Sequence, residues 1–484
     1  MSLSLAFNTA QSSLTANAAK IALSSRNVAG AGEASASRKI AVTTTAADGS
    51  VRVVSITRAT GSALFDRMLG ATSDSAAQQA LADGLGRLAQ TVGDPQDPTS
   101  PVARLGTLKD ALARAADTPD DMTLAQAAVT AAQDVAATLN TATDTVQQVR
   151  TDADAAIANS VANVNDLLHQ FEAENSAIVK GSAAGADMTD ALDRRDSILA
   201  KLSEEIGIST VTRANNDIVI YTEGGATLFE TTARSVGFTP SHTLDAKTQG
   251  GSVFVDGVSV TGRDATMPVR TGRIAGLTQL RDEAASTYQT QLDELARGLT
   301  DAFQETDGAG NTRAGLFVPA SGSAAVPGAV SPGLAGTLAV NAAVDVAQGG
   351  DIRLLRDGGM NGAAFAANTT GAASFAGRLK ALSAALDAPR AYDGAAQLSD
   401  NQSLVSFGTA SVSWLQGARK AADTRLDSEK TVLAQASNAL SAATGVNLDD
   451  EYASQLELER GYQATSKLMG VVNQLYDSLF RMIG

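Results

Sequence analysis

The feature that most constrains the fold is an apolar repeat in the last eighteen residues, KLMGVVNQLYDSLFRMIG. Met469, Val472, Tyr476, Leu479 and Ile483 recur at intervals of three and four residues. This spacing places them on one face of a helix, and the face continues to the penultimate residue. Chain ends are usually frayed, because little is left to pack against them. The repeat therefore requires a partner surface.

A second amphipathic helix is predicted at the beginning of the chain. Its residues recur at the same intervals, and only Ser25 among them is not apolar: Leu3, Phe7, Ala10, Leu14, Ala18, Ile21, Ser25 and Val28. Each helix alone is short and marginally stable in water. We expect the two stripes to cover each other as an antiparallel or staggered pair, with further copies of the chain covering the rest. Both ends should then be mobile in the free monomer.

Composition favours long helices with slender interfaces. Hydrophobic residues make up 44% of the 484 residues, but aromatic residues only 4%. Alanine is abundant, and it favours helix while burying little area. The net charge of −15 argues against nucleic acid and anionic membranes as partners. No stretch approaches the roughly 18 apolar residues of a membrane-spanning helix, so we expect no membrane insertion.

The chain shows no convincing catalytic motif. Without cysteine it has no disulfide, thiolate metal site or cysteine nucleophile. Its two histidines, His169 and His242, have no partner at metal-binding spacing, and His169 is expected to be solvated beside a helix seam. GLGRLA, residues 84–89, fits a loose dinucleotide pattern but lies in helical sequence without a preceding strand. We therefore expect no enzyme activity, no cofactor and no metal.

Two acidic clusters are interpreted as structural. Asn447 is a good helix N-cap, and residues 449–451 would then fill the first helical turn, where the helix dipole favours acids. In LDRRD, Asp193 and Asp196 share one helix face with arginines nearby. That cluster is interpreted as a surface charge lattice.

The middle of the chain alternates between helical and β patterns. RKIAVTTT and SVRVVSITRA flank AADG and predict a β-hairpin, after which helix resumes at about Ser62 until GDPQDPTSP interrupts it. Residues 123–171 predict one or two long helices. Their seam has coiled-coil spacing and consists of Ile157, Val161, Val164, Leu168 and Phe171.

Residues 206–269 change to a β pattern with Gly and Asn turns. Helix returns at 274–305, a Gly/Pro/Ser-rich connection covers 308–333, and helix dominates from about Ser374. The predicted fold class is mainly α with a β insertion, in an elongated multidomain protein. A terminal domain of 1–35 with 445–484 forms a coiled-coil-like core. A helical rod of 36–205 with 270–444 lies beside it and contains the hairpin and the Gly/Pro-rich connection. Residues 206–269 form an outer β domain.

The segment GVNLDDEYASQLELERGYQATSKLMGVVNQLYDSLFRMI resembles the C-terminal signature of the axial proteins of the bacterial flagellum, which build its rod, hook and filament. The shared elements are residues 445–449, residues 462–464 and the C-terminal apolar repeat through Leu479. ALDRRDSILAKLSE (191–204), the block 272–305 and GLF (315–317) resemble the hook-associated members rather than flagellin or hook protein. The N-terminal motif keeps 27–29 and the Ser-Arg pair 37–38 but lacks the usual Pro and Tyr.

This resemblance implies a structural adaptor that joins hook to filament and polymerises through its terminal helices into the inner wall of a tube. Implied partners are copies of itself in a ring, the hook protein, the second junction protein, and an export chaperone on the C-terminal helix. The candidate residues for subunit packing and chaperone binding are Leu3, Phe7, Leu14, Ile21, Leu448, Tyr462, Met469, Val472, Tyr476 and Leu479.

The resemblance also implies where the protein works. The N-terminus has no positive charge between Met1 and Lys20 and no sustained apolar block, so it does not predict a secretory signal peptide, and by itself indicates a cytoplasmic protein. Axial proteins, however, leave the cell through the flagellum's own type III apparatus without a cleaved signal. Two alternatives stay open: another axial component, such as the second junction protein or a divergent flagellin, and a secreted enzyme with its site in the β insertion.

Overall fold

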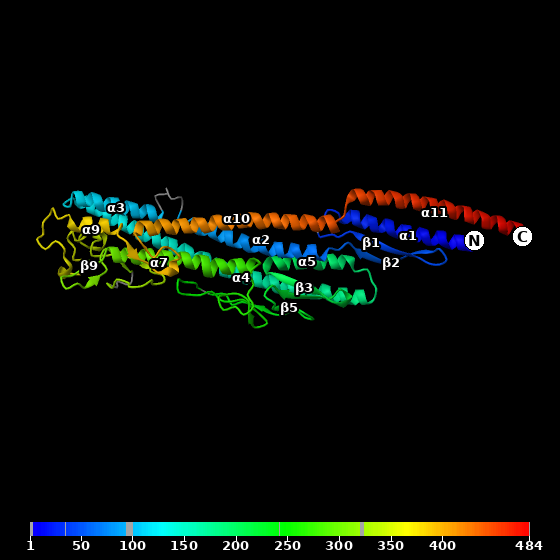
Figure 1. Ribbon diagram of the computed structural model, residues 1–484, viewed down its shortest axis with the longest axis horizontal. Helices are drawn as coiled ribbons and strands as arrows, with labels where there is room; N and C mark the ends of the chain where they lie inside the picture. The colour runs from blue at the N-terminus through cyan, green and yellow to red at the C-terminus, as the bar shows by residue number, and fades with distance from the viewer. Residues whose placement is uncertain (1–2, 34, 93–99, 242, 320–323, 484) are drawn as a thin grey trace.

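The computed structural model describes residues 3–33, 35–92, 100–241, 243–319 and 324–483. The molecule is long and narrow, and both termini lie at the same end (Figure 1). It is mainly helical with several small sheets, so the predicted fold class is confirmed. His242, most of GDPQDPTSP and part of the Gly/Pro/Ser-rich connection lie outside the described residues.

Five long helices build the rod. They are α2 (Ser62–Ala89), α3 (Pro101–Asp117), α4 (Met122–Ala183), α5 (Thr189–Glu205) and α10 (Leu404–Thr444). The longest, α4, is one uninterrupted helix of 62 residues, which corresponds to about 90 Å. All five residues of the predicted seam along α4 are buried, and His169 beside them is exposed, as expected.

Further helices complete the rod. α6 (Arg273–Gln279) continues through a π-helical turn at Leu280–Ala284 into α7 (Ala285–Ala302), and α8 (Leu354–Asp357) and α9 (Gly377–Ala385) lie near the far end. Most buried apolar residues of the rod and the sheets form one connected core, which contains no residue of the two terminal helices among those described. Within the described residues, no helix is long and apolar enough to cross a membrane.

Two glycines allow α2 to approach its neighbours closely. A Cβ on Gly84 would lie within 2.0–2.8 Å of the Leu280 side chain, so GLGRLA is a helix-packing segment of α2 and not a dinucleotide-binding turn. On α6, a Cβ on Gly276 would lie 2.2 Å from the backbone oxygen of Ala77. The contact between α2 and α6 therefore requires glycine at position 276.

Gly276→Ala is expected to lower the free energy of unfolding by about 1–3 kcal/mol, because the backbones of two helices would have to separate. The matched control is Gly86→Ala on α2, where a Cβ would meet nothing within 4 Å. That variant should gain about 0.5–1 kcal/mol from helix propensity. Urea denaturation followed by circular dichroism measures the free energy of unfolding of both variants. A change of the same sign in the two variants would contradict the packing argument.

The predicted hairpin is β1 (Lys39–Thr45) paired antiparallel with β2 (Val51–Arg58), with a register shift at Val42/Thr43. It was assigned to the rod from the sequence, but it lies beside the N-terminal helix (Figure 1). The physical reason is its alternation, which turns one face of each strand toward that helix. The domain boundaries themselves stay a prediction.

The β insertion contains two small antiparallel sheets. One holds β3 (Ile208–Thr212), β4 (Ile218–Thr222) and β5 (Thr227–Phe229), and the other β6 (Val236–Gly237), β7 (Phe254–Val255) and β8 (Val258–Ser259). They lie along α4 (Figure 1), where Phe229 meets Phe171 edge to face at 4.9 Å between ring centroids. The buried residues of the insertion thus join the core of the rod.

Short two-stranded sheets lie toward the other end of the molecule. They pair β9 (Glu305–Thr306) with β10 (Thr312–Arg313), β11 (Phe317–Pro319) with β12 (Leu338–Val340), and β13 (Arg390–Ala391) with β14 (Asn401–Gln402). The sequence pattern indicated only a connection where β10 and β11 lie. Strands of two or three residues are too short to show an alternation.

Candidate assembly interface and its polar junction

The two terminal helices lie side by side and run in opposite directions (Figure 1). They are α1 (Leu3–Gly30) and α11 (Leu448–Ile483), and we call them the terminal pair. Phe7 meets Tyr476 edge to face, with ring centroids 6.4 Å apart, and near the other end Ser24 contacts Glu451. The antiparallel arrangement expected from the two stripes is therefore present within one chain.

The residues singled out on α1 are half-buried: Leu3, Phe7, Leu14 and Ile21. Of the residues singled out on α11, only Val472 is buried, at 5% exposure, while Met469 and Tyr476 are half-buried. The other three, Leu448, Tyr462 and Leu479, are exposed.

Geometry explains why three of the residues singled out on α11 are exposed. Leu448 and Leu479 lie near the two ends of α11, opposite the ends of α1. Tyr462 is rotated by roughly 80° around the helix from Val472, because successive residues turn by about 100°. The six residues therefore do not form one continuous covered stripe.

A second apolar stripe on α11 faces solvent, and the sequence analysis missed it. It consists of Leu468, Val471, Leu475, Leu479 and Met482, whose exposed fractions range from 45% to 84%. We call these residues the outer stripe. Their spacing of three and four residues keeps them on one side of the helix, next to the face that covers α1. The signal in the sequence is a series of apolar doublets, 468–469, 471–472 and 475–476, in which one residue faces α1 and its neighbour faces outward.

The terminal pair joins the rod through a buried carboxylate at the start of α11. Glu451 is only 3% exposed. It accepts hydrogen bonds from Ser24 Oγ at 2.8 Å and Asn27 Nδ2 at 3.2 Å, and it pairs with Arg38 Nε at 2.7 Å. Asn27 also bonds both the N–H and the C=O of Lys39, each at 2.9 Å. The Asn of the N-terminal motif thus ties α1 to the first residue of the hairpin.

A second buried carboxylate lies on α5. Asp193 is 7% exposed and pairs with Lys39 Nζ at 2.6 Å and Arg58 Nη1 at 2.9 Å. It also accepts a hydrogen bond from Ser37 Oγ at 2.6 Å, and Asp196 pairs with Arg58 Nη2 at 2.7 Å. The interpretation of LDRRD as a surface charge lattice is therefore wrong. Its cations come from the hairpin, which is distant in sequence, and the hairpin covers the acids so that Asp193 is buried and Asp196 half-buried.

Residues 37–39 connect the two carboxylates. Ser37 and Lys39 turn to Asp193, while Arg38 between them turns to Glu451, as expected for an extended chain with alternating side chains. The backbone N–H of Arg38 also donates to the carbonyl of Thr444, the last residue of α10, at 2.8 Å. We call Ser37–Lys39 with Asp193 and Glu451 the polar junction. It joins α1, α5, α10 and α11.

The N-cap predicted for the C-terminal helix is confirmed. Asn447 Oδ1 accepts a hydrogen bond from the Asp449 backbone N–H at 3.0 Å, and α11 begins at Leu448. The three acids do occupy the first turn, as expected. Glu451 differs from its two exposed neighbours because it is buried in the polar junction.

Stability should depend on pH through Asp193. Burial alone would raise the pKa of Asp193, but hydrogen bonds from Lys39, Ser37 and Arg58 outweigh it and hold the pKa below its ordinary value. A carboxyl whose pKa is lowered on folding stabilises the folded state at every pH above its ordinary pKa, which is about 4. This stabilisation is lost as the pH falls through the pKa of the folded state. Burial raises the pKa of Asp196 instead, so its contribution has the opposite sign.

We therefore expect the wild-type chain to lose stability below about pH 4 more steeply than Asp193→Asn, which cannot titrate at this position. Thermal unfolding between pH 3 and pH 7 measures the difference. Because Asp196 is present in both proteins, its contribution largely cancels in the comparison. Parallel pH profiles for the two proteins would contradict the assignment.

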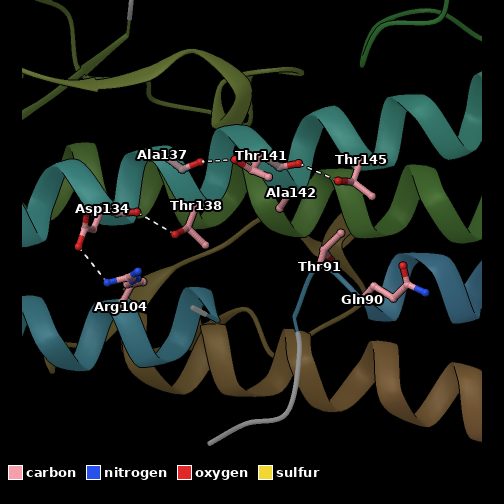
Figure 2. Close-up of a pocket in the computed structure, with 9 residues that line it drawn as sticks. All are labelled: Gln90, Thr91, Arg104, Asp134, Ala137, Thr138, Thr141, Ala142 and Thr145. Carbon is pink, nitrogen blue, oxygen red and sulfur yellow. Dashed lines mark hydrogen bonds and ion pairs between the residues drawn. The ribbon is translucent and has the colours of Figure 1, made fainter. Parts of the chain in front are cut away.

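A hollow of about 430 Å³ lies between α3 and α4 (Figure 2). Arg104 and Asp134 pair across it at 2.9 Å, and the hydroxyls of Thr138, Thr141 and Thr145 bond carbonyls of their own helix. The three hydroxyls and the Nη1 of Arg104 thus already have partners within the protein. The described part of the chain contains no group of three or more acidic or histidine side chains placed to hold a metal ion.

Comparison with known proteins identifies the family. Residues 66–317, just over half of the chain, match the family model described as the flagellar hook-associated protein FlgK helical domain. Residues 437–482 match the model described as the flagellar basal body rod FlgEFG protein C-terminal region. The first match contains most of α2, all of α3 to α7 and the Asp193 side of the polar junction, and the second contains most of α11.

Individual relatives are more distant. Flagellar hook-associated protein 1 of Salmonella typhimurium is 28% identical over 158 residues, and that of Escherichia coli K12 is 26% identical over 158 residues. Each alignment covers 32% of this chain and 28% of the relative, so it spans less than a third of the curated proteins. A solved structure titled as the flagellar hook junction protein FlgK from Burkholderia pseudomallei aligns at 20% identity with a TM-score of 0.43, covering 52% of this chain and 46% of that one. On the match to the helical domain, the chain belongs to the flagellar hook-associated protein FlgK family.

Proposed function

We propose that this protein is a structural adaptor of the bacterial flagellum that joins the hook to the filament and polymerises through its terminal pair. The observation that carries this proposal is the outer stripe of α11. Five large apolar side chains line one side of a helix and meet solvent in the single chain. An exposed apolar patch of this kind marks a surface that another protein covers.

Copies of the same chain are the proposed first partner of the outer stripe. At this end of the molecule α11 forms one outer layer, α1 the middle layer and the hairpin the other outer layer (Figure 1). The hairpin also exposes apolar side chains, namely Ile40, Val42 and Val54. Two different apolar surfaces on opposite sides of one unit favour a heterologous contact, which generates rings or helical tubes. The candidate packing residues of both helices are proposed to act at this contact.

Three further partners are proposed: the hook protein, the second junction protein and an export chaperone. An amphipathic helix with an uncovered apolar face suits a chaperone groove, since such grooves bind residues at spacings of three and four. The chaperone would hold α11 in the cytoplasm before export. The protein would then leave through the flagellar export apparatus, without a cleaved signal peptide, and work outside the cell at the hook–filament junction.

The proposed domain organisation is based on which residues belong to the apolar core of the rod. The terminal pair shares no member with the apolar core of the rod among the described residues, which supports a separate terminal domain of 1–35 with 445–484. The insertion 206–269 packs on α4, so we propose that it decorates the rod.

We propose no catalytic role. The family is one of structural flagellar proteins. The match of residues 66–317 to the hook-associated helical domain favours the junction over a divergent flagellin or the second junction protein, which the sequence pattern left open.

A clean deletion of the gene tests the proposal. We expect electron microscopy to show bare hooks, and flagellin to be lost to the medium. Complementation with the wild-type gene should restore filaments. Intact filaments in the deletion strain would refute a role at the junction.

A further inference from the structure

We propose that the loop 357–362 is a carboxylate-binding site that Glu305 of the same chain occupies, and that the loop will bind a free carboxylate ion when this side chain is removed. The site lies at the end of the molecule opposite the two termini, near β9 and α9 (Figure 1). It shares no residue with the terminal pair or the polar junction, so the inference does not depend on the proposed function.

The occupant of the site is a fully buried carboxylate. Glu305 is the first residue of β9 and is 0% exposed. It follows closely on α7, which ends at Ala302, so a packed helix holds it in place. Burial of a carboxylate is costly unless hydrogen-bond donors and a cation replace the water that it loses. Glu305 has both kinds of partner.

The hydrogen-bond donors come from the loop. Oε1 of Glu305 accepts hydrogen bonds from the Gly359 N–H at 2.9 Å and the Met360 N–H at 3.2 Å. Oε2 accepts from the backbone N–H and the side-chain Nδ2 of Asn361, each at 3.0 Å. Successive backbone N–H groups that point to one place form a general anion-binding arrangement, the nest. We call Gly359, Met360 and Asn361 the nest.

The sequence DGGMNG shapes the nest without help from Glu305. Gly358 and Gly359 have φ angles of 75° and 90°, a conformation that side chains with a Cβ rarely adopt. The carbonyl of Asp357, just before them, accepts hydrogen bonds from the N–H groups of Ala367 and Asn368 at 2.8 and 2.9 Å. Both the backbone conformation and these contacts persist when the carboxylate is removed.

A buried guanidinium balances the charge of the carboxylate. Nη2 of Arg378 lies 3.1 Å from Oε1 of Glu305, and the Arg378 side chain is 9% exposed. Its Nε donates to the carbonyl of Leu355 at 3.2 Å, which positions the guanidinium independently of Glu305. Burial lowers the pKa of Arg378, and the charge of Glu305 opposes this effect. Without Glu305, the site would present N–H donors and a positive charge in a place shielded from water.

The arrangement of the donors favours a carboxylate as the ligand. The four N–H donors divide equally between the two oxygens of one planar group. Glu305→Ala removes Cγ, Cδ and both carboxylate oxygens, which correspond to the four heavy atoms of an acetate ion. The space that this substitution leaves therefore has the size, the donors and the charge for acetate.

Hydrogen exchange of the full chain at pH 7 tests the inference. In Glu305→Ala, the amides of residues 357–368 should exchange about 100-fold faster or more, because the guanidinium and the nest lose their buried partner. An ion of this size is expected to bind with a Kd on the order of 10 mM. Sodium acetate at about 0.5 M should then slow the exchange of the variant roughly 50-fold. Each rate is compared with that of the wild-type chain in the same solution.

Two solutes and two variants serve as controls. Acetamide has the shape of acetate without its charge, and sodium chloride supplies the same ionic strength, so neither should slow exchange. Glu305→Gln fills the site with a neutral side chain, so its loop should exchange faster than in the wild type and should not respond to acetate. Asp301→Ala removes another acid that pairs with an arginine, Arg390, but the Asp301 side chain is 39% exposed. That variant should not respond to acetate either.

Slowing of exchange by acetate that is confined to Glu305→Ala would support the inference. Unchanged exchange of residues 357–368 in Glu305→Ala would overturn it, and so would equal slowing by acetate and acetamide. The same response to acetate in Glu305→Gln would show that the ion acts elsewhere and would overturn it too. A Glu305→Ala chain that remains unfolded in acetate would mean that the nest does not accept the free ion.

Discussion

Leu479→Asp is expected to abolish assembly of the hook–filament junction while leaving the isolated chain folded. The Leu479 side chain is 45% exposed in the single chain, so its replacement removes little packing there. In the proposed contact between copies it would become buried. Each contact would then lose the apolar burial and gain a buried charge, a change of about 3 kcal/mol or more. Motility in soft agar and electron microscopy of the cells measure the outcome.

Ser466→Asp is the matched control. Ser466 is exposed on α11 and lies roughly opposite the outer stripe, since it precedes Leu468 by two positions. It introduces the same charge on the same helix away from the proposed contact, so cells should swim normally. Normal motility of Leu479→Asp would count heavily against assembly through the outer stripe.

The fate of the Leu479→Asp chain separates assembly from export. If the export chaperone also binds the outer stripe, the variant should bind it less tightly and accumulate inside the cell. If only the contact between copies uses the stripe, the variant should appear in the medium. Immunoblots of cells and medium distinguish the two.

Asp193→Ala is expected to lower the free energy of unfolding by about 3–5 kcal/mol. The change leaves the Lys39 ammonium and the Arg58 guanidinium without the carboxylate that both contact, in a place where little water reaches them. Urea denaturation measures the loss, and hydrogen exchange should place it in the hairpin and α1.

Asp190→Ala provides the comparison on the same helix. Asp190 pairs with Arg26 and Lys39, but its side chain is 58% exposed. Exposed ion pairs contribute about 1 kcal/mol or less. Similar, small losses for the two variants would restore the interpretation of LDRRD as a surface charge lattice.

Local periodicity in the sequence predicted much of the fold. The seam of α4 was predicted from its spacing alone, and the hairpin from the alternation around AADG. Asn447 was recognised as a cap because capping uses only a few neighbouring residues. The short strands between 305 and 340 were missed, because so few residues show no alternation.

The candidate site was predicted only in part. The pairing of the two terminal helices followed from their stripes, whereas the outer stripe was overlooked because the same segment carries two overlapping repeats. Neither buried carboxylate was identified. Asp193 meets cations from Lys39 and Arg58, and Glu451 meets Arg38, all more than 130 positions away in the sequence. Local spacing contains no information on such partners.

The sequence by itself thus determined where the long helices and the hairpin form, because hydrogen bonding and amphipathic repeats within an element involve neighbouring residues. Only the tertiary structure decided which apolar face of α11 is covered and which acids are buried. Burial depends on what packs against a side chain, and that partner comes from a distant part of the chain. In this protein α1 covers one face of α11 and leaves the outer stripe in solvent, while the hairpin covers Asp193.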